Sequence, residues 1–176
     1  TNATICAGDA AATFDAGAGY TTYAWSGNGT GAAQTTSGTA AGTYTVMVTD
    51  ANGCKDTASA TLTGNAKPTI TPASATICSG DAAVNFDAGS GYATYAWSGP
   101  ATASTQTISA TVAGTYQVIV TTGSGCKDTV TATLTVNSKP NVTLTNATIC
   151  SGDAAATFDA GAGYTTYAWS GNGTGA

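Results

Sequence analysis

The chain has 176 residues, a formal net charge of −5, 7% charged residues and no histidine. All of its acidic residues are Asp and all of its basic residues are Lys, so the side chains that most often transfer protons or bind phosphate are absent. This composition argues against an enzyme, and it argues against a nucleic-acid partner because phosphates require clustered cations. We therefore expect no catalytic residue and no cofactor, and the apolar runs are too short to span a membrane.

The sequence repeats itself every 72 residues without an insertion. Cysteines and tryptophans recur at this spacing: Cys6, Cys78 and Cys150; Cys54 and Cys126; and Trp25, Trp97 and Trp169. We expect three modules: residues 1–67, whose first strand is missing, residues 68–139, which are complete, and residues 140–176, which begin a third module and stop before its second half. The chain is then a window on a longer periodic protein.

Within each module, apolar residues alternate with polar ones, which is typical of half-buried β-strands. In chain order, the first module has such runs at 10–14, 23–25, 43–49 and 58–62. In the second module a strand is expected to start at Thr69, just after Pro68. The expected core consists of the inward-facing members of these runs and their counterparts: Phe14, Trp25, Tyr44, Val46, Leu62, Phe86, Trp97, Tyr116, Val118 and Leu134.

Turns rich in Gly, Asp and Asn separate the runs, at 15–19, 26–29, 41–42 and 50–53. Many short strands, frequent turn signals and no helical period favour two packed antiparallel sheets over a parallel fold. The predicted fold is all-β, built from tandem immunoglobulin-like antiparallel β-sandwich modules with about seven strands each.

Each complete module carries two cysteines that are 48 residues apart. Without histidine, a zinc site and an activated thiol are both disfavoured. We predict a disulfide inside each module, with Cys6, Cys54, Cys78 and Cys126 as the bonded residues and Cys150 left unpaired by truncation. Lasting disulfides require an oxidising compartment, so the chain is expected outside the cytoplasm.

Two further groups of side chains have alternative interpretations. Tyr23 and Trp25 could stack on a sugar, although a tryptophan at this position of a sandwich is more often part of the core. Tyr20, in a Gly-flanked turn, is the better candidate for an exposed contact. Asp9, Asp15, Asp50 and Asp56 could bind calcium at the module ends, but no Asp-x-Asp-x-Asp-Gly loop is present, which favours turn and cap roles.

Four segments of the second module carry a resemblance to a known family: Ile-Cys-Ser-Gly-Asp at 77–81, Tyr-Ala-Trp-Ser-Gly at 95–99, Gly-Thr-Tyr-Gln-Val-Ile-Val at 114–120 and Gly-Cys-Lys-Asp at 125–128. This pattern resembles the PKD-like and Ig-like repeats of large Bacteroidota surface proteins, including gliding-motility adhesins. The resemblance covers essentially the whole chain. It implies export and display on the bacterial cell surface.

The resemblance also points to O-glycosylation, because that phylum modifies Asp-Thr or Asp-Ser followed by an apolar residue. Thr57 and Thr129 match this pattern and are candidate sites. The competing interpretation is that threonine beside aspartate is simply common at the start of a strand.

The predicted function is a structural or adhesive repeat array that forms an extracellular stalk or filament on a bacterial surface. Its expected partners are neighbouring modules of the same long chain or further copies of itself. One alternative is a module that binds surface glycans or proteins through its loops, such as 20–22 and 28–31. A second alternative is a spacer within a secreted polysaccharide-degrading enzyme.

Overall fold

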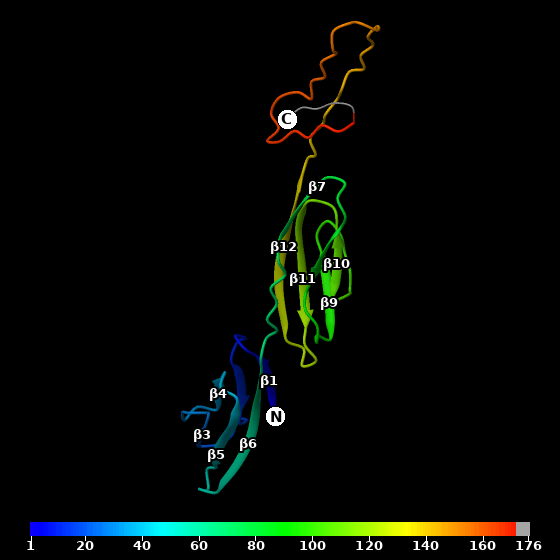
Figure 1. Cartoon of the computed structure of the whole chain (residues 1–176). Helices are drawn as coiled ribbons and strands as arrows, with labels where there is room; N and C mark the ends of the chain where they lie inside the picture. Colours follow the sequence, from blue (N-terminus) through cyan, green and yellow to red (C-terminus); the bar gives the residue numbers. More distant parts are fainter. Residues whose placement is uncertain (172–176) are drawn as a thin grey trace.

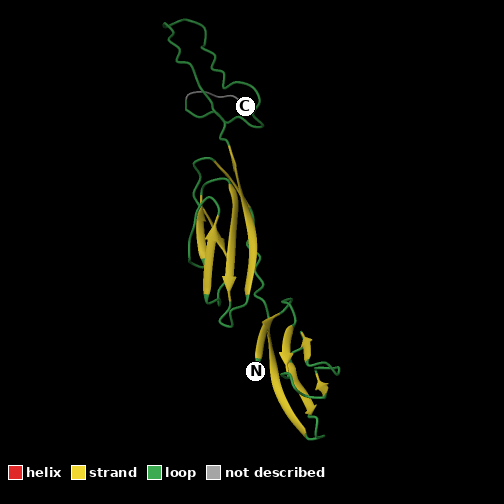
Figure 2. Ribbon diagram, turned by 180° about the vertical axis from the view of Figure 1, so that it is seen from behind, coloured by secondary structure: helices red, strands yellow, loops and turns green. Residues whose placement is uncertain are grey.

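The computed structural model describes residues 1–171, and every regular element within them is a β-strand. The strands form two modules that lie end to end (Figure 1, Figure 2). Module 1 contains β1 (Ala3–Cys6), β2 (Ala12–Asp15), β3 (Thr22–Gly27), β4 (Thr35–Gly38), β5 (Gly42–Thr49) and β6 (Lys55–Asn65). Module 2 contains β7 (Ala75–Cys78), β8 (Val84–Asp87), β9 (Thr94–Ser98), β10 (Thr107–Ala110), β11 (Gly114–Thr121) and β12 (Lys127–Asn137).

Each module is a sandwich of a four-stranded and a two-stranded sheet. The larger sheets have the orders β1-β6-β5-β3 and β7-β12-β11-β9, and the smaller ones pair β2 with β4 and β8 with β10. The immunoglobulin-like all-β fold is thus confirmed. Two details differ from the expectation: each described module has six strands instead of about seven, and the pairs β1/β6 and β7/β12 are parallel.

The parallel pair follows from the way the chain passes through a module. The chain enters module 2 at one end through the linker, and β7 and β12 both run toward the opposite end, where Cys78 lies opposite Asn137. Entry at one end and exit at the other let successive modules follow one another along a line (Figure 1).

The strand expected to start at Thr69 is not formed, although its side chains pack as part of module 2. Ile70 is buried in the core and Pro68 is buried as well, but residues 66–74 join no ladder. Pro68 and Pro72 lie within this segment, and proline has no N–H to donate to a sheet. The segment is therefore held by side-chain packing and by the hydroxyl of Tyr92, which donates to the Thr69 carbonyl (3.0 Å).

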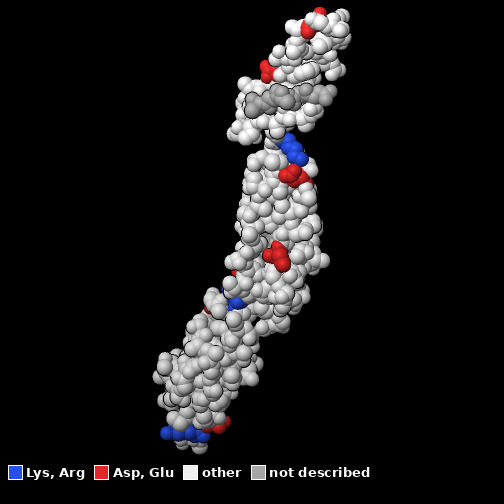
Figure 3. Space-filling model, viewed as in Figure 1, with Lys and Arg blue, Asp and Glu red and all other residues white. Residues whose placement is uncertain are grey.

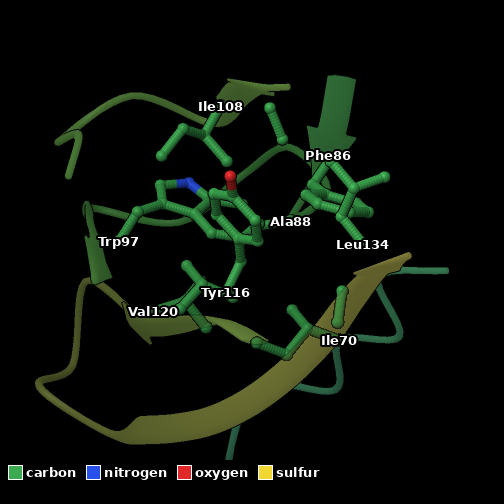
Figure 4. Packing of buried hydrophobic residues seen from close by; sticks show 11 residues of the cluster. Ile70, Phe86, Ala88, Trp97, Ile108, Tyr116, Val120 and Leu134 are labelled. Carbon is green, nitrogen blue, oxygen red and sulfur yellow. The ribbon is translucent and has the colours of Figure 1, made fainter. Parts of the chain in front are cut away.

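The core of module 2 lies between its two sheets. Figure 4 shows Trp97, Ile108, Phe86 and Tyr116 converging there, with Ile70 close by. Of the ten residues expected in the cores of the two modules, all but Trp25 are buried.

Trp25 is half-buried because module 1 is open where module 2 is covered by the Ile70 segment. At this place module 1 has a groove of about 360 Å³, whose lining includes Phe14, Trp25 and Val46. The buried cluster of module 1 is correspondingly small and consists of Phe14, Tyr44 and Leu62, with Trp25 packed against it.

Residues 140–171, the described part of the expected third module, contain no strand. Their sequence copies the start of module 1, and Val142, Leu144 and Ile149 are each half-exposed or more. A strand needs a neighbouring strand for its hydrogen bonds, and no ladder joins residues 140–171 to another segment. Residues 172–176, the last part of the expected third module, lie outside the described residues. Among the described residues, no helix is present that could cross a bilayer.

Candidate functional site

The feature that joins the two modules is a disulfide between Cys6 of module 1 and Cys126 of module 2. The two Cα atoms are 5.6 Å apart, within the range that a disulfide requires. The expectation of one bond inside each module is therefore wrong for this structure: Cys6 is not bonded to Cys54, and Cys78 is not bonded to Cys126.

The physical reason is that the two cysteines of one module lie at its opposite ends. Cys6 is opposite Asn65 at the end of β6, whereas Cys54 immediately precedes Lys55 at its beginning. A strand of this length separates them by about 35 Å at roughly 3.3 Å per residue. The cysteine at the far end of module 1 instead meets the cysteine at the near end of module 2.

On the module 1 side, the disulfide is anchored where β1 and β6 end together. The N–H of Ala7 donates to the Asn65 carbonyl (2.8 Å), and the N–H of Cys6 donates to the Asp9 carboxylate (3.0 Å). The same carboxylate pairs with Lys67 at 3.3 Å. The hydrogen bond from Cys6 first, and then that from Lys67, hold the pKa of Asp9 below its usual value.

On the module 2 side, the disulfide is held in the turn between β11 and β12. The N–H of Thr122 donates to the Cys126 carbonyl (2.8 Å), and the N–H of Cys126 donates to the Thr122 hydroxyl (3.1 Å). Cys126 is fully buried, and its Sγ lies 4.0 Å from the Asn65 carbonyl oxygen of module 1. The turn is thus packed against the end of the preceding module.

The remaining three cysteines of the described chain, Cys54, Cys78 and Cys150, are free thiols and all are exposed. Cys54 lies in the β5–β6 turn of module 1, and Cys78 is the last residue of β7 in module 2. Cys54 and Cys78 therefore lie at the outer ends of their modules, far from the Cys6–Cys126 junction.

The aromatic side chains Tyr23 and Trp25 hold the loops of module 1. The indole N–H of Trp25 donates to the Ala33 carbonyl (2.9 Å), and the hydroxyl of Tyr23 donates to the Gly17 carbonyl (2.9 Å). Tyr20 stands edge-on to Tyr23, with ring centroids 6.0 Å apart, and is 42% exposed. Tyr20 is the most accessible ring of the three.

The aspartates considered as calcium ligands have turn and cap contacts in the structure. Asp50 accepts hydrogen bonds from the N–H groups of Asn52 and Cys54 (both 2.8 Å). Asp15 accepts from Gln34 and from the N–H of Gly17, and these two contacts, the first one foremost, lower its pKa. Within residues 1–171 no group of three or more candidate ligand side chains gathers.

The candidate glycosylation residues Thr57 and Thr129 are exposed near the starts of β6 and β12. Their N–H groups donate to the carboxylates of Asp56 and Asp128, the residues that precede them (2.8 Å each). Figure 3 shows that charged atoms are sparse on the face it presents and lie mostly near the ends of the modules.

Several solved structures show a weak similarity to this chain. Sidekick-1 immunoglobulin domains 1–4 match with a TM-score of 0.34 and 14% identity over 81% of this chain and 51% of theirs. The insect immune protein hemolin matches with a TM-score of 0.41 and 18% identity over 77% of this chain and 44% of its own. This chain thus spans about half the length of these two proteins.

A third match is SGBP-B of the Bacteroides ovatus mixed-linkage glucan utilization locus, whose structure contains a mixed-linkage heptasaccharide. Its TM-score is 0.29 and its identity 15%, over 75% of this chain and 42% of its own. No protein-family model matches the chain, and no curated protein matches it. With TM-scores below 0.5 and identities below 20%, these matches carry no conclusion about this chain.

Proposed function

We propose that the chain is a non-enzymatic structural array in an extracellular stalk or filament on a bacterial surface. The observation that carries the proposal is the Cys6–Cys126 bond, which joins the end of one module to the beginning of the next. Two domains connected by a short linker alone are expected to move relative to each other. A covalent second connection restricts that motion and makes the pair a stiffer spacer.

The extracellular part of the proposal is supported by the disulfide, since such bonds persist in oxidising compartments. The bacterial part is supported by the resemblance of segments 77–81, 95–99, 114–120 and 125–128 to Bacteroidota surface repeats. Immunolabelling of intact cells of the source organism tests both parts, and label found only after the cells are permeabilised would contradict them.

The spacer role is tested by measuring distances between spin labels in the two modules. Cys6→Ser/Cys126→Ser removes the bond, and Cys150→Ser, in the segment without strands, is the matched control. We expect a narrow distance distribution for the control and a broader one for the double variant. Equal widths would show that the bond does not stiffen the pair.

A second candidate function, binding of glycans or proteins through loops, is favoured by the exposed ring of Tyr20 and the groove beside Trp25. Aromatic rings are common contact surfaces because they combine large area with little conformational freedom. Glycan-array binding that Tyr20→Ala abolishes would favour this function over a purely structural one. The spacer of a secreted polysaccharide-degrading enzyme stays an alternative that requires a catalytic domain in the same parent chain.

A further inference from the structure

The free cysteine at the outer end of module 2 occupies the same local structure as the bonded cysteine of module 1. The N–H of Cys78 donates to the Asp81 carboxylate (2.9 Å), just as that of Cys6 donates to Asp9. The N–H of Ser79 donates to the Asn137 carbonyl (2.8 Å), and Lys139 pairs with Asp81 at 3.0 Å. Every polar contact described for the Cys6 side of the junction therefore recurs around Cys78.

The free cysteine at the outer end of module 1 likewise copies Cys126. The N–H of Asp50 donates to the Cys54 carbonyl (2.9 Å), as that of Thr122 does to Cys126. The N–H of Cys54 donates to the side chain of Asp50 (2.8 Å), where Cys126 uses the Thr122 hydroxyl. The two outer ends of the pair thus carry the two halves of a junction that is already formed once inside it.

The bonded and free cysteines differ in burial. Cys126 is fully buried whereas Cys54 is exposed, and Cys6 is half-buried whereas Cys78 is exposed. Because the local hydrogen bonds are equivalent, the contact between the two modules accounts for the greater burial of Cys6 and Cys126. Cys54 and Cys78 are the free, exposed counterparts of Cys126 and Cys6.

We propose that Cys78 of one copy forms a disulfide with Cys54 of a second copy, so that the chains join head to tail. The partner of Cys78 is inferred from the junction inside the chain. There, Cys6, the module 1 counterpart of Cys78, is bonded to Cys126 in the turn between β11 and β12. Cys54 lies in the equivalent turn between β5 and β6, so the outer end of module 1 presents a matching cysteine. The contact joins the outer end of module 2 in one copy to the outer end of module 1 in the next. Each dimer therefore keeps one free end of each kind, so the contact generates an open polymer instead of a closed dimer. This inference deepens the proposed filament by naming the bond that extends it.

The segment that follows module 2 leaves Cys78 accessible. Within the described residues, the hydrogen bonds of residues 144–171 all stay inside the segment 141–171, such as that from the Tyr164 hydroxyl to the Asn141 carbonyl (2.9 Å). No described hydrogen bond ties 140–171 to module 2, and Cys78 is exposed. Cys78 is therefore exposed with this segment in place.

The bond forms by thiol–disulfide exchange with a small disulfide such as oxidised glutathione. The Cys78 thiolate attacks one glutathione sulfur, which forms a mixed disulfide and releases one glutathione thiolate. The Cys54 thiolate of the second copy then attacks the Cys78 sulfur and releases the second glutathione. Two protein thiols lose two protons and two electrons, and one oxidised glutathione is reduced to two thiols.

The test uses the Cys150→Ser chain with its Cys6–Cys126 bond intact, so that Cys54 and Cys78 are its two free thiols. After incubation with oxidised glutathione, we expect a ladder of oligomers on a non-reducing gel. Among the cross-linked peptides, those joining Cys54 to Cys78 should outnumber both symmetric kinds combined. Random collision would give equal numbers, and that result or the absence of oligomers would overturn the proposal.

Two controls separate the bond from misfolding. Adding Cys54→Ser or Cys78→Ser should stop the ladder at the monomer, and the dimer that symmetric pairing predicts in these variants would contradict the proposal. Blocking both thiols of the folded chain with iodoacetamide should have the same effect without any further substitution. The spin-label test of the spacer role uses single chains, so either experiment can fail while the other succeeds.

Discussion

Single carboxylates organise the turns of this protein. Asp9 and Asp81 each accept a hydrogen bond from the N–H of a cysteine and pair with a lysine, and Asp15 and Asp87 each accept hydrogen bonds from a glutamine side chain and a glycine N–H. Each contact favours the ionised form, and all four groups have a pKa below the usual value of 3.8. Aspartate therefore acts here as an ionised cap.

The lowered pKa values predict acid sensitivity. A carboxylate whose pKa is depressed by folding contributes stability above its unfolded pKa, and this contribution is lost as the pH falls through the folded value. We expect the free energy of unfolding to decline below about pH 3.8 and the decline to be shallower in Asp15→Asn. Urea titrations across this range measure it, with Asp159→Asn, outside the two sandwiches, as the control. Equal slopes for Asp15→Asn and the unaltered chain would contradict it.

Glycine is required where β3 ends against the neighbouring strand. Gly27 has φ +78°, and a Cβ there would lie 2.5 Å from the Thr43 carbonyl oxygen. Gly53 has a similar φ of +82° with nothing within 4 Å of that position. A side chain at Gly53 would therefore cause backbone strain alone, whereas one at Gly27 would cause backbone strain and a steric clash.

We expect Gly53→Ala to cost about 1–2 kcal/mol from the left-handed backbone alone. Gly27→Ala should cost about 1–3 kcal/mol more, because β3 and β5 must separate to admit the methyl group. Chemical denaturation of the two variants measures the difference. Equal losses would show that the strands move apart freely.

At the scale of elements, the linker and the core of module 2 are continuous. Ile70 is buried between the sheets although its segment belongs to no strand, whereas Thr71 beside it is exposed. The linker therefore stabilises the module that it enters through side-chain burial, without ladder hydrogen bonds.

Ile70→Ala is expected to destabilise module 2 by about 2–5 kcal/mol, through lost burial and the cavity left behind. Thr71→Ala is the control and should change stability by less than about 0.5 kcal/mol. Hydrogen exchange of the β11 and β12 amides assigns the loss to module 2. Protection unchanged by Ile70→Ala would mean that the segment only covers a core that is stable without it.

At the scale of the whole molecule, the disulfide constrains the relation between modules and crosses neither core. Each sandwich has its own two sheets and its own buried cluster, and the bond lies at the boundary between the modules. Mild reduction of the chain is therefore expected to leave its circular dichroism at room temperature unchanged while it broadens the inter-module distance distribution. A loss of strand signal on reduction would show that the bond supports the fold of a module.

The 72-residue period, most of the core and the strands β2, β3, β5 and β6 of module 1 could be predicted from the amino-acid sequence, whereas β1 and β4 were missed. Alternation of apolar residues is a local property, so it suffices to identify Phe14, Tyr44, Leu62 and their copies as inward-facing. The same pattern places Trp25 in the core, yet its burial depends on a segment equivalent to that around Ile70.

Tertiary structure alone decided which cysteines meet. Spacing along the chain places Cys6 and Cys54 in one module, but β6 holds them at opposite ends, and a disulfide forms only where two Cα atoms come within about 7 Å. Cys54 directly precedes β6, which the structure shows to be the longest strand of its module, whereas the alternating run at 58–62 was short and gave no sign of that length. Pairing across the junction follows from the end-to-end path of the chain, which no local pattern specifies.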